Sequence, residues 1–298
     1  MITVQRAKVK KHKSERNGNK KQGARLLKKE RKEEEKMKIM MKVLAVMMAL
    51  FLALAPAMAE TDMEMVKNKG TLYVGITDFA PMDYRDDKGE WIGFDADMAK
   101  AFAEYLGVKV EFVEIEWDNK ILELNAGTVD CIWNGMTLTD AVKAAMETAN
   151  PYANNAQVVI IPAAKKDAFA DVAAMSKLVF AVEAGSAGEA EIDKLGYEKT
   201  AVTSQADALM EVAAGTSDAA VIDSLMAAAM VGEGTSYPDL IYTFGLNSEE
   251  YGVGFRKGSD LAAALNDFMV KAWADGTMQQ IAETYKVQAA VIPQVIAE

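Results

Sequence analysis

The chain has 298 residues, of which 51% are apolar and 26% charged, a composition typical of a globular protein with one large or two medium domains. Its formal net charge of −11 is unevenly divided: residues 1–59 carry 16 Lys and Arg against 5 Asp and Glu, whereas residues 60–298 carry 17 against 39. Such an acidic body repels phosphate backbones, which argues against nucleic acid as a partner. The only histidine is His12 and the only cysteine is Cys131, so the body has no Ser-His-Asp or Cys-His arrangement, no ordinary zinc site and no internal disulfide.

The segment 37–59 has the pattern of a secretory signal peptide. Two lysines precede an uncharged run over residues 43–59, which contains Pro56 and closes on small residues. A basic start, an apolar core and a small-x-small ending predict cleavage after Ala59; an uncleaved membrane anchor is the alternative. Because no cysteine follows the run, we expect a protein that is secreted across the cytoplasmic membrane, is periplasmic or otherwise extracytoplasmic, and is not a lipoprotein.

Residues 1–36 form a basic extension. Its lysine and arginine clusters look like a nucleic-acid-binding arm, but an arm that precedes a signal peptide would be removed or never made. We therefore expect residues 1–36 to be disordered, and translation to begin at Met37, Met40 or Met41.

From Thr71 onward, short strands alternate with amphipathic helices. Thr71–Ile76 is the first expected strand, and Asp95–Leu106 follows as a helix that ends at Gly107. The next expected elements are a strand at Val108–Ile115, a helix from Asp118 to near Gly127 and a buried strand at Asp130–Trp133. The same alternation restarts at Leu178–Val182 and runs through Ile222. It predicts an α/β fold with mainly parallel strands.

Two segments of the chain repeat one pattern. Residues 126–134 and 214–223 each contain the glycine end of a helix, a tight turn, an apolar strand and a final polar residue, which is Asn134 in the first and Asp223 in the second. Ligands of open α/β sheets bind outside the carboxyl ends of strands, so the pattern predicts a cleft between two lobes. A chance similarity of two helix–strand units is the alternative.

A series of short motifs between residues 64 and 286 is similar to one known family. Three of them are GTLYVG at 70–75, GFDADMA at 93–99 and YGVGFRKG at 251–258. The others are Trp117-Asp118, GMTLT at 135–139, Pro151-Tyr152, EAGS at 183–186 and ADGT at 274–277. This series resembles the bacterial extracellular solute-binding proteins of amino-acid ABC importers, family 3.

The resemblance implies a periplasmic-binding-protein type II fold. Its two α/β lobes are each a mainly parallel sheet flanked by helices, and two crossover strands join them and allow closure on a ligand by hinge motion. The first lobe is expected at 60–160 plus 246–298, and the second at 161–245.

The resemblance also assigns ligand-binding roles in both lobes. Phe79 and Trp117 match positions whose side chains line the ligand, with core packing as the alternative. The matched strand-end positions are Asn134, Gly135, Thr137, Glu183, Ser186, Ala187 and Asp223. Asp223 matches the carboxylate that receives the ligand's α-ammonium, although it could also cap the helix that follows.

One departure from the family bears on the ligand. The family places an arginine after its G-M-T-x-T motif to hold the ligand's α-carboxylate, and Val142 stands in that position here. Lys143 could approach the carboxylate as a point charge, or could be an exposed helix lysine. The cleft candidates also include three carboxylates, Asp78, Glu183 and Asp223. Because these outnumber the nearby cation, we expect a cationic or zwitterionic ligand, either a basic amino acid or an amine without a carboxylate.

Together these features predict an extracytoplasmic substrate-binding protein that delivers an amino acid or related amine-bearing solute to an ABC permease and its ATPase subunit. We expect a monomer without cofactor, metal or catalytic residue, and Cys131 as a small core residue. An enzyme on the same fold, similar to cyclohexadienyl dehydratases, is one alternative, although its anionic substrates would need the missing arginine. A soluble co-receptor for a sensor is the other.

Overall fold

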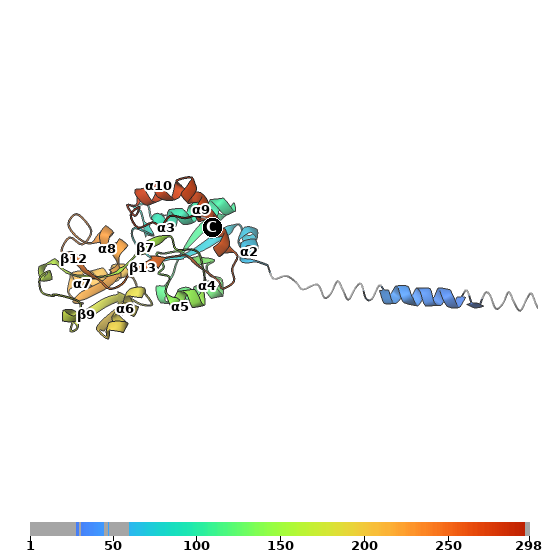
Figure 1. Cartoon of the computed structure of the whole chain (residues 1–298), viewed down its shortest axis with the longest axis horizontal. Helices are drawn as coiled ribbons and strands as arrows, with labels where there is room; N and C mark the ends of the chain where they lie inside the picture. Colours follow the sequence, from blue (N-terminus) through green and yellow to red (C-terminus); the bar gives the residue numbers. More distant parts are fainter. Residues whose placement is uncertain (1–27, 30, 45–46, 48–59, 296–298) are drawn as a thin grey trace, which may run out of the picture. The chain divides into compact units, whose positions relative to one another are not determined.

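The computed structural model of the chain describes residues 28–29, 31–44, 47 and 60–295, which belong to two units that divide after Ala59 (Figure 1). In the first unit, residues 31–44 are helical with exposed side chains. Residues 31–36 of the extension that we expected to be disordered lie in this helix, where strong helix formers predominate and Lys36 Nζ lies 2.9 Å from Glu33 Oε1 one turn away. Residues 1–27 and the expected cleavage site after Ala59 lie outside the described residues. Within the described ranges, no helix is both long enough and apolar enough to cross a membrane.

The first sheet of the second unit has the strand order β4-β1-β5-β14-β6. Its strands are β1 (Thr71–Ile76), β4 (Lys109–Glu114), β5 (Cys131–Ile132), β6 (Glu147–Thr148) and β14 (Gly254–Phe255). β1 is parallel to β4 and β5, whereas β14 is antiparallel to β5 and β6. The strands expected over 71–76, 108–115 and 130–133 are thus present, the last two slightly shorter than expected.

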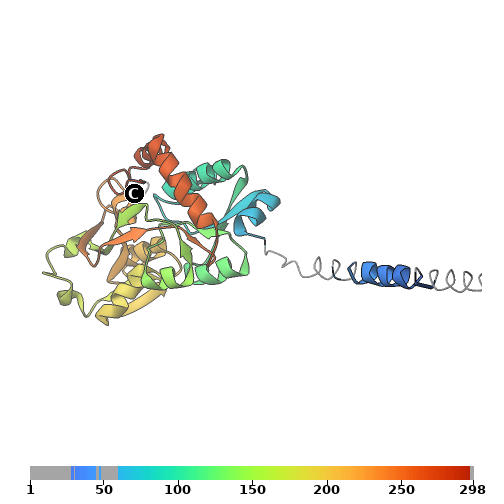
Figure 2. The ribbon, with the colours of Figure 1, turned by 45° about the vertical axis from the view of Figure 1, so that its right-hand side comes forward.

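Helices cover both faces of this sheet. They are α2 (Asp62–Lys69), α3 (Phe94–Leu106), α4 (Lys120–Ala126), α5 (Asp140–Ala145), α9 (Leu261–Ala274) and α10 (Thr277–Thr284). Cys131 and Trp133 belong to one apolar core, while Ile132 between them belongs to a second. Neighbouring residues of a strand point to opposite faces, so a sheet that is covered on both sides requires an unbroken apolar run of this kind. The late helices α9 and α10 pack beside the early helix α3 (Figures 1 and 2).

The second sheet has the order β10-β9-β11-β8-β12 and carries α6, α7 and α8. Its strands are β8 (Gln157–Pro162), β9 (Val179–Glu183), β10 (Glu198–Val202), β11 (Ala219–Asp223) and β12 (Leu240–Gly245). Its helices are α6 (Ala187–Leu195), α7 (Gln205–Ala214) and α8 (Ser224–Met230). β9 is parallel to β10 and β11, whereas β8 is antiparallel to β11 and β12. In each sheet four strands therefore run in one direction and a single strand, β14 in the first sheet and β8 in the second, runs against them, which confirms the expected α/β fold with mainly parallel strands.

Two chain segments connect the lobes that are built on these sheets. β7 (Ala153–Asn155) and β13 (Glu249–Tyr251) form an antiparallel pair with Asn155 opposite Glu249, and this pair lies between the two sheets (Figure 1). β7 leads directly into β8, whose buried apolar run begins at Val158. The second sheet consequently begins at Gln157, before the boundary expected at residue 161.

The remaining elements are short. β2 (Tyr84–Arg85) pairs with β3 (Trp91–Ile92) ahead of α3. The 3-10 turns are η1 (Trp117–Asn119), η2 (Ala163–Lys165) and η3 (Ala173–Met175). The helix expected from Asp118 therefore begins as the turn η1 and continues as α4, which ends at Gly127 with a φ of 75°. A left-handed glycine is a common end of a helix, and for this reason the end at Gly127 could be predicted from the sequence.

Candidate ligand-binding site

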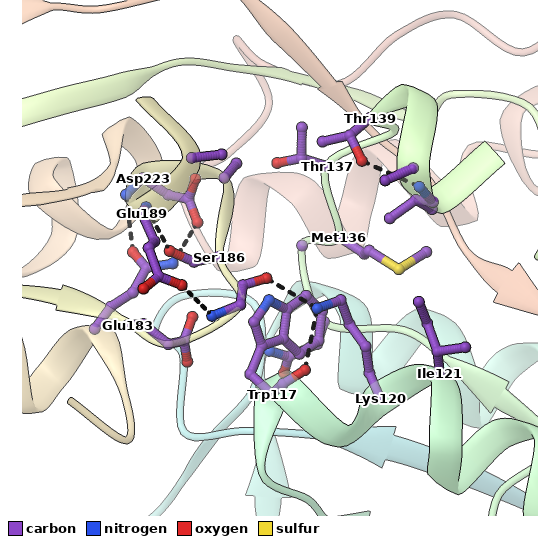
Figure 3. A pocket seen from close by; sticks show the side chains of 18 of the residues that line it. Trp117, Lys120, Ile121, Met136, Thr137, Thr139, Glu183, Ser186, Glu189 and Asp223 are labelled. Atoms are coloured by element: carbon purple, nitrogen blue, oxygen red, sulfur yellow. Dashed lines mark hydrogen bonds between the residues drawn. The ribbon is translucent and has the colours of Figure 1, made fainter. Parts of the chain in front are cut away.

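The carboxyl ends of β5, β9 and β11 lie around one cavity of about 510 Å³, which is lined by residues of both lobes (Figure 3). β9 ends with Glu183 and β11 with Asp223, while Asn134 follows β5 by two residues. A cavity of this volume is within the range that small ligands occupy. The cleft predicted from the repeated helix–strand pattern therefore corresponds to a cavity between the two lobes.

Most residues expected at the site line this cavity. They are Trp117, Asn134, Gly135, Thr137, Glu183, Ser186, Ala187 and Asp223. Val142, which stands where the family has its arginine, also lines the cavity and is 6% exposed. It contributes an apolar side chain to the wall.

Three expected residues lie elsewhere. Phe79 is buried and packs against the backbone of Gly135, a residue of the cavity lining. The contact is so close that a Cβ added to Gly135 would stand 2.3 Å from Phe79 Cε1. Asp78 is exposed and outside the lining. Lys143 is also exposed, and it lines a neighbouring hollow of about 580 Å³ that shares six lining residues with the cavity: Thr137, Thr139, Asp140, Ala187, Ala190 and Lys194. Helix α5 thus places Lys143 at the neighbouring hollow and not in the cavity that contains Glu183 and Asp223.

Asp223 is held by a set of side-chain amides. It is 4% exposed, and Gln205 Nε2 donates to its Oδ2 at 2.6 Å. Asn155 Nδ2 donates to its Oδ1 at 2.6 Å, and Gln157 Nε2 donates to the same oxygen. The backbone N–H of Asp223 donates in turn to Gln205 Oε1 at 2.8 Å. The carboxylate is therefore fixed in orientation at the end of β11 by residues of three other segments.

A second carboxylate, Glu249, shares two of these amides. Asn155 Nδ2 and Gln157 Nε2 donate to Glu249 Oε1 at 2.7 and 2.8 Å, and Thr137 Oγ1 donates to it at 2.8 Å. Burial raises the pKa of Asp223 to about 8, and the charge of Glu249 adds to the increase, while the three amides oppose it. The connecting strands β7 and β13 thus reach the cavity through one hydrogen-bonded network.

Glu183 is the other buried carboxyl group of the lining. It is 3% exposed at the end of β9, and burial raises its pKa to about 8. The charge of Asp223 adds to this increase, whereas Lys120 opposes it. Burial and a neighbouring carboxylate thus disfavour the ionised form of each of these two groups, and a bound cation would stabilise both ionised forms.

Lys120, which the sequence analysis did not select, lies opposite these groups on the first lobe. It is 7% exposed at the start of α4, and its Nζ donates to the backbone carbonyls of Trp117 at 3.1 Å and Gly185 at 2.9 Å (Figure 3). Its Nζ also lies 4.7 Å from the centre of a Trp117 ring. Because Gly185 belongs to the second lobe, Lys120 joins the two lobes directly. Burial lowers the pKa of Lys120, while nearby carboxylates, Glu183 foremost, oppose the decrease.

The segment after β5 forms the wall between these groups, and its polar atoms are already bonded within the protein. Asn134 Nδ2 donates to Thr77 Oγ1 at 2.7 Å, and Asn134 Oδ1 accepts from the Thr77 N–H at 2.9 Å. The Gly135 N–H donates to Asp95 Oδ2 at 2.6 Å. Gly135 has a φ of 55° and lies against the Phe79 ring, so the wall requires a glycine there. These contacts fix the shape of the cavity.

The charge of the lining is strongly acidic. Its carboxylates are Asp140, Glu183, Glu189, Asp193 and Asp223, and its cations are Lys120 and Lys194. Of these, Glu189 and Asp193 share a partner outside the cavity, Lys199, whose Nζ lies 2.8 Å from Glu189 Oε1 and 2.6 Å from Asp193 Oδ1. The described residues contain no group of three or more His, Cys, Asp or Glu side chains arranged to hold a metal ion. A bound cation would stabilise the ionised forms of the buried pair Glu183 and Asp223, whereas a bound anion would oppose their ionisation.

The sequence profile of the bacterial extracellular solute-binding proteins, family 3, matches residues 72–288, which extend over both lobes. The chain belongs to this family. The family resemblance that the motifs suggested is thereby confirmed.

Relatives of the chain include proteins named for the amino acids that they bind. A probable histidine-binding protein of Neisseria gonorrhoeae is 30% identical over 227 residues, 73% of this chain and 84% of the relative. An L-arginine-binding protein of Pseudomonas aeruginosa is 30% identical over 220 residues, 70% of this chain and 84% of the relative. Among solved structures, a mutant of ArgBP from T. maritima has a TM-score of 0.70 and 29% identity, over 76% of this chain and 99% of that one. The fold is thus that of amino-acid-binding proteins.

One relative is an enzyme. The membrane-bound lytic murein transglycosylase F of Serratia proteamaculans is 26% identical over 237 residues, which are 75% of this chain but 47% of the enzyme. The relatives named as binding proteins match over most of their length, whereas the enzyme matches over less than half of its own.

Proposed function

We propose that the protein captures a cationic amino acid in the cavity between its two lobes. The observation that carries this proposal is the pair of acidic groups in the lining, Glu183 and Asp223: both are buried, and among the described residues no Lys or Arg nitrogen lies within 4.0 Å of either carboxyl group. A cationic ligand compensates buried carboxylates that otherwise lose their hydration, whereas glutamate or aspartate adds to the repulsion. The names of the arginine- and histidine-binding relatives support the same class of ligand.

Asp223 is the residue that we assign to the ligand's α-ammonium group. Three amides orient its carboxylate, so the ligand meets an acceptor that does not have to reorganise on binding. The Trp117 side chain lines the same cavity and offers an aromatic surface next to a cationic group. Glu183 remains for a second cationic group of the ligand, such as a guanidinium or a side-chain ammonium.

The biological role that we propose is solute capture outside the cytoplasm for an ABC importer. Family membership supports this role, and the signal-peptide pattern of residues 37–59 supports the location. The ligand would pass from the closed cavity to a membrane permease that an ATPase subunit drives. Residues 60–156 with 246–295 would move as one lobe and 157–245 as the other, with β7 and β13 as the hinge.

We propose no catalytic role for the cavity. Its hydroxyl groups serve the local structure: Ser186 Oγ accepts the Glu189 N–H at 3.0 Å, Thr139 Oγ1 accepts the Val142 N–H at 3.1 Å, and Thr137 is bonded to Glu249. The single histidine of the sequence, His12, lies outside the described residues. Ser186 and Thr139 thus serve as helix caps, and the Glu249 oxygen that accepts from Thr137 also accepts from Asn155 and Gln157, an arrangement that supports a structural role for these hydroxyl groups and binding over catalysis.

A thermal-shift screen of the purified protein tests this function. A ligand at 100 times its dissociation constant stabilises a protein by about 2.7 kcal/mol, which raises the melting temperature by a few degrees for a domain of this size. We expect shifts with arginine, lysine, ornithine or histidine and none with glutamate or aspartate. A shift with the acidic amino acids alone contradicts the proposal.

A further inference from the structure

The cavity contains one ammonium group that is buried, and it has no carboxylate partner. Of the two lysines of the lining, Lys194 is exposed and pairs with Glu191 Oε1 at 2.7 Å, whereas Lys120 is 7% exposed. Among the described residues, no Asp or Glu oxygen lies within 4.0 Å of Lys120 Nζ. Burying an ammonium group without a counter-ion is unfavourable in free energy, and an anionic group of a bound ligand would compensate it.

The two arginines of residues 60–295 do not supply this cavity with positive charge. Arg256 pairs with Asp62 Oδ1 at 3.1 Å, and Arg85 lies 3.5 Å from Glu114 Oε2 and over the Trp91 ring. Neither lines the cavity. Lys120 is therefore the buried cationic group of the described lining that can meet an anionic part of a ligand.

The contacts of Lys120 leave part of its donor capacity unused. An ammonium group has three N–H donors, and two hydrogen bonds are formed, to the carbonyls of Trp117 and Gly185. Those two acceptors are neutral and come from different lobes, so they hold Nζ in place as the lobes meet. In the part of the chain that the structure describes, the third donor has no protein acceptor, and Lys120 is a lining residue.

The two lobes thus contribute buried groups of opposite character to the cavity, acidic groups from one lobe and an ammonium group from the other. Glu183 and Asp223 stand at the strand ends of the second lobe, and Lys120 stands at the start of α4 on the first (Figure 3). A ligand that has ammonium or guanidinium groups and also a carboxylate compensates both sides. A ligand with cationic groups alone leaves the buried Lys120 without a counter-ion and adds repulsion to it.

We propose that Lys120 binds the carboxylate of the ligand through its third N–H, so that this site selects an amino acid and rejects the corresponding amine that lacks the carboxylate. The inference rests on the proposed function, and it chooses between the two ligand types that the sequence analysis left open. Lys120 is in this account a specificity-determining residue. Its bond to Gly185 makes the carboxylate site complete only when the lobes are closed.

Matched pairs of amino acid and amine test this proposal by calorimetry on the purified protein. The pairs are arginine with agmatine, lysine with cadaverine and histidine with histamine, which differ only in the carboxylate. We expect the unchanged protein to bind at least one of these amino acids about 10- to 100-fold more tightly than its amine, which is the range of a charge-assisted hydrogen bond. In Lys120→Met, we expect that ratio to fall to about 1, with the amine's affinity unchanged or improved.

Two further variants make the result specific. Lys194→Met removes the other lysine of the lining and is expected to keep the preference for the amino acid. Lys120→Arg retains the cation and is expected to retain the preference, which keeps the proposal testable where Lys120→Met does not fold.

Each outcome decides. Equal binding of amino acid and amine by the unchanged protein overturns the carboxylate site. An equal loss of affinity for both partners in Lys120→Met also overturns it, because Lys120 then only links the lobes. If no amino acid and no amine of the three pairs binds, the proposed function itself fails. Tight binding of glutamate or aspartate would also contradict the proposed function, independently of Lys120.

Discussion

Ligand binding is expected to release protons, because the two buried carboxyl groups of the cavity are protonated near neutral pH. Burial raises the pKa of Glu183 to about 8 and that of Asp223 to about 8. A cationic ligand stabilises the ionised forms, which lowers both pKa values in the complex. The protein without ligand therefore holds more protons than the complex below pH 8, and affinity must rise as the pH rises toward 8.

The size of the effect follows from one proton. Because the two carboxyl groups interact, they titrate as a pair, and we work the magnitude for one proton, which is the lower limit for the pair. A group of pKa about 8 is about 1% ionised at pH 6 and half ionised at pH 8, so the affinity for arginine rises about 50-fold between these values. Above pH 8 the affinity rises by no more than a further factor of about 2.

Calorimetry in buffers of different ionisation enthalpy measures the protons directly. At pH 7 we expect about one proton released for each arginine bound, and a smaller number for Glu183→Gln. Asp193→Asn, which changes an exposed carboxylate of the same lining, is the control and is expected to release as many protons as the unchanged protein. A dissociation constant that is the same at pH 6 and pH 8, with no proton released, refutes the reasoning.

Three other results are expected. Asp223→Asn removes the charge that receives the ligand's ammonium group, and calorimetry is expected to show a loss of affinity of about 100-fold, whereas Asp193→Asn changes it little. Gly135→Ala and Gly127→Ala each place a Cβ at a positive φ, 55° and 75°, but only the Cβ at residue 135 meets a ring, that of Phe79. Thermal melting is therefore expected to show a loss of stability that is larger for Gly135→Ala by about 1–3 kcal/mol. Equal losses in the two variants would contradict the contact with Phe79. The intact mass of protein recovered from outside the cytoplasm is expected to correspond to a chain that begins at Glu60, and a mass that includes residues before 37 would contradict both the cleavage site and the proposed start of translation.

The strand ends that build the site could be predicted from the sequence because their signals are local. Gly127 and Gly215 end helices in the left-handed conformation, and the apolar runs after them are short enough to be strands. The polar residues Asn134 and Asp223 then follow at the carboxyl ends of β5 and β11, where they line one cavity. Element boundaries were less exact, as the start of the second sheet at Gln157 illustrates.

The role of Lys120 could not be predicted, because its environment is tertiary. A lysine in the first turn of a helix is usually exposed, and nothing near it in sequence indicates burial. It is buried because the second lobe brings Gly185 against η1 and α4, where a Cβ on Gly185 would stand 2.7 Å from Asp118 Oδ1. The sequence offered Lys143 instead, since that lysine directly follows the position of the expected arginine.

The amide network around Asp223 was missed for a related reason. Asn155, Gln157 and Glu249 lie on or beside the connecting strands, far from Asp223 in sequence. The available signal was weak: two polar amides stand at the start of the otherwise apolar segment 155–161. Polar side chains at such places usually find buried partners, but the sequence does not say which ones.

The most direct test of the central claim is a calorimetric comparison of L-arginine and L-glutamate on the purified protein at pH 8. The two ligands share the α-amino acid part and differ in the charge of the side chain, so the comparison isolates the acidic lining with Glu183 and Asp223. We predict that arginine binds at least 100-fold more tightly than glutamate, which corresponds to about 2.7 kcal/mol. Equal or tighter binding of glutamate would contradict the assignment of a cationic amino acid to this cavity.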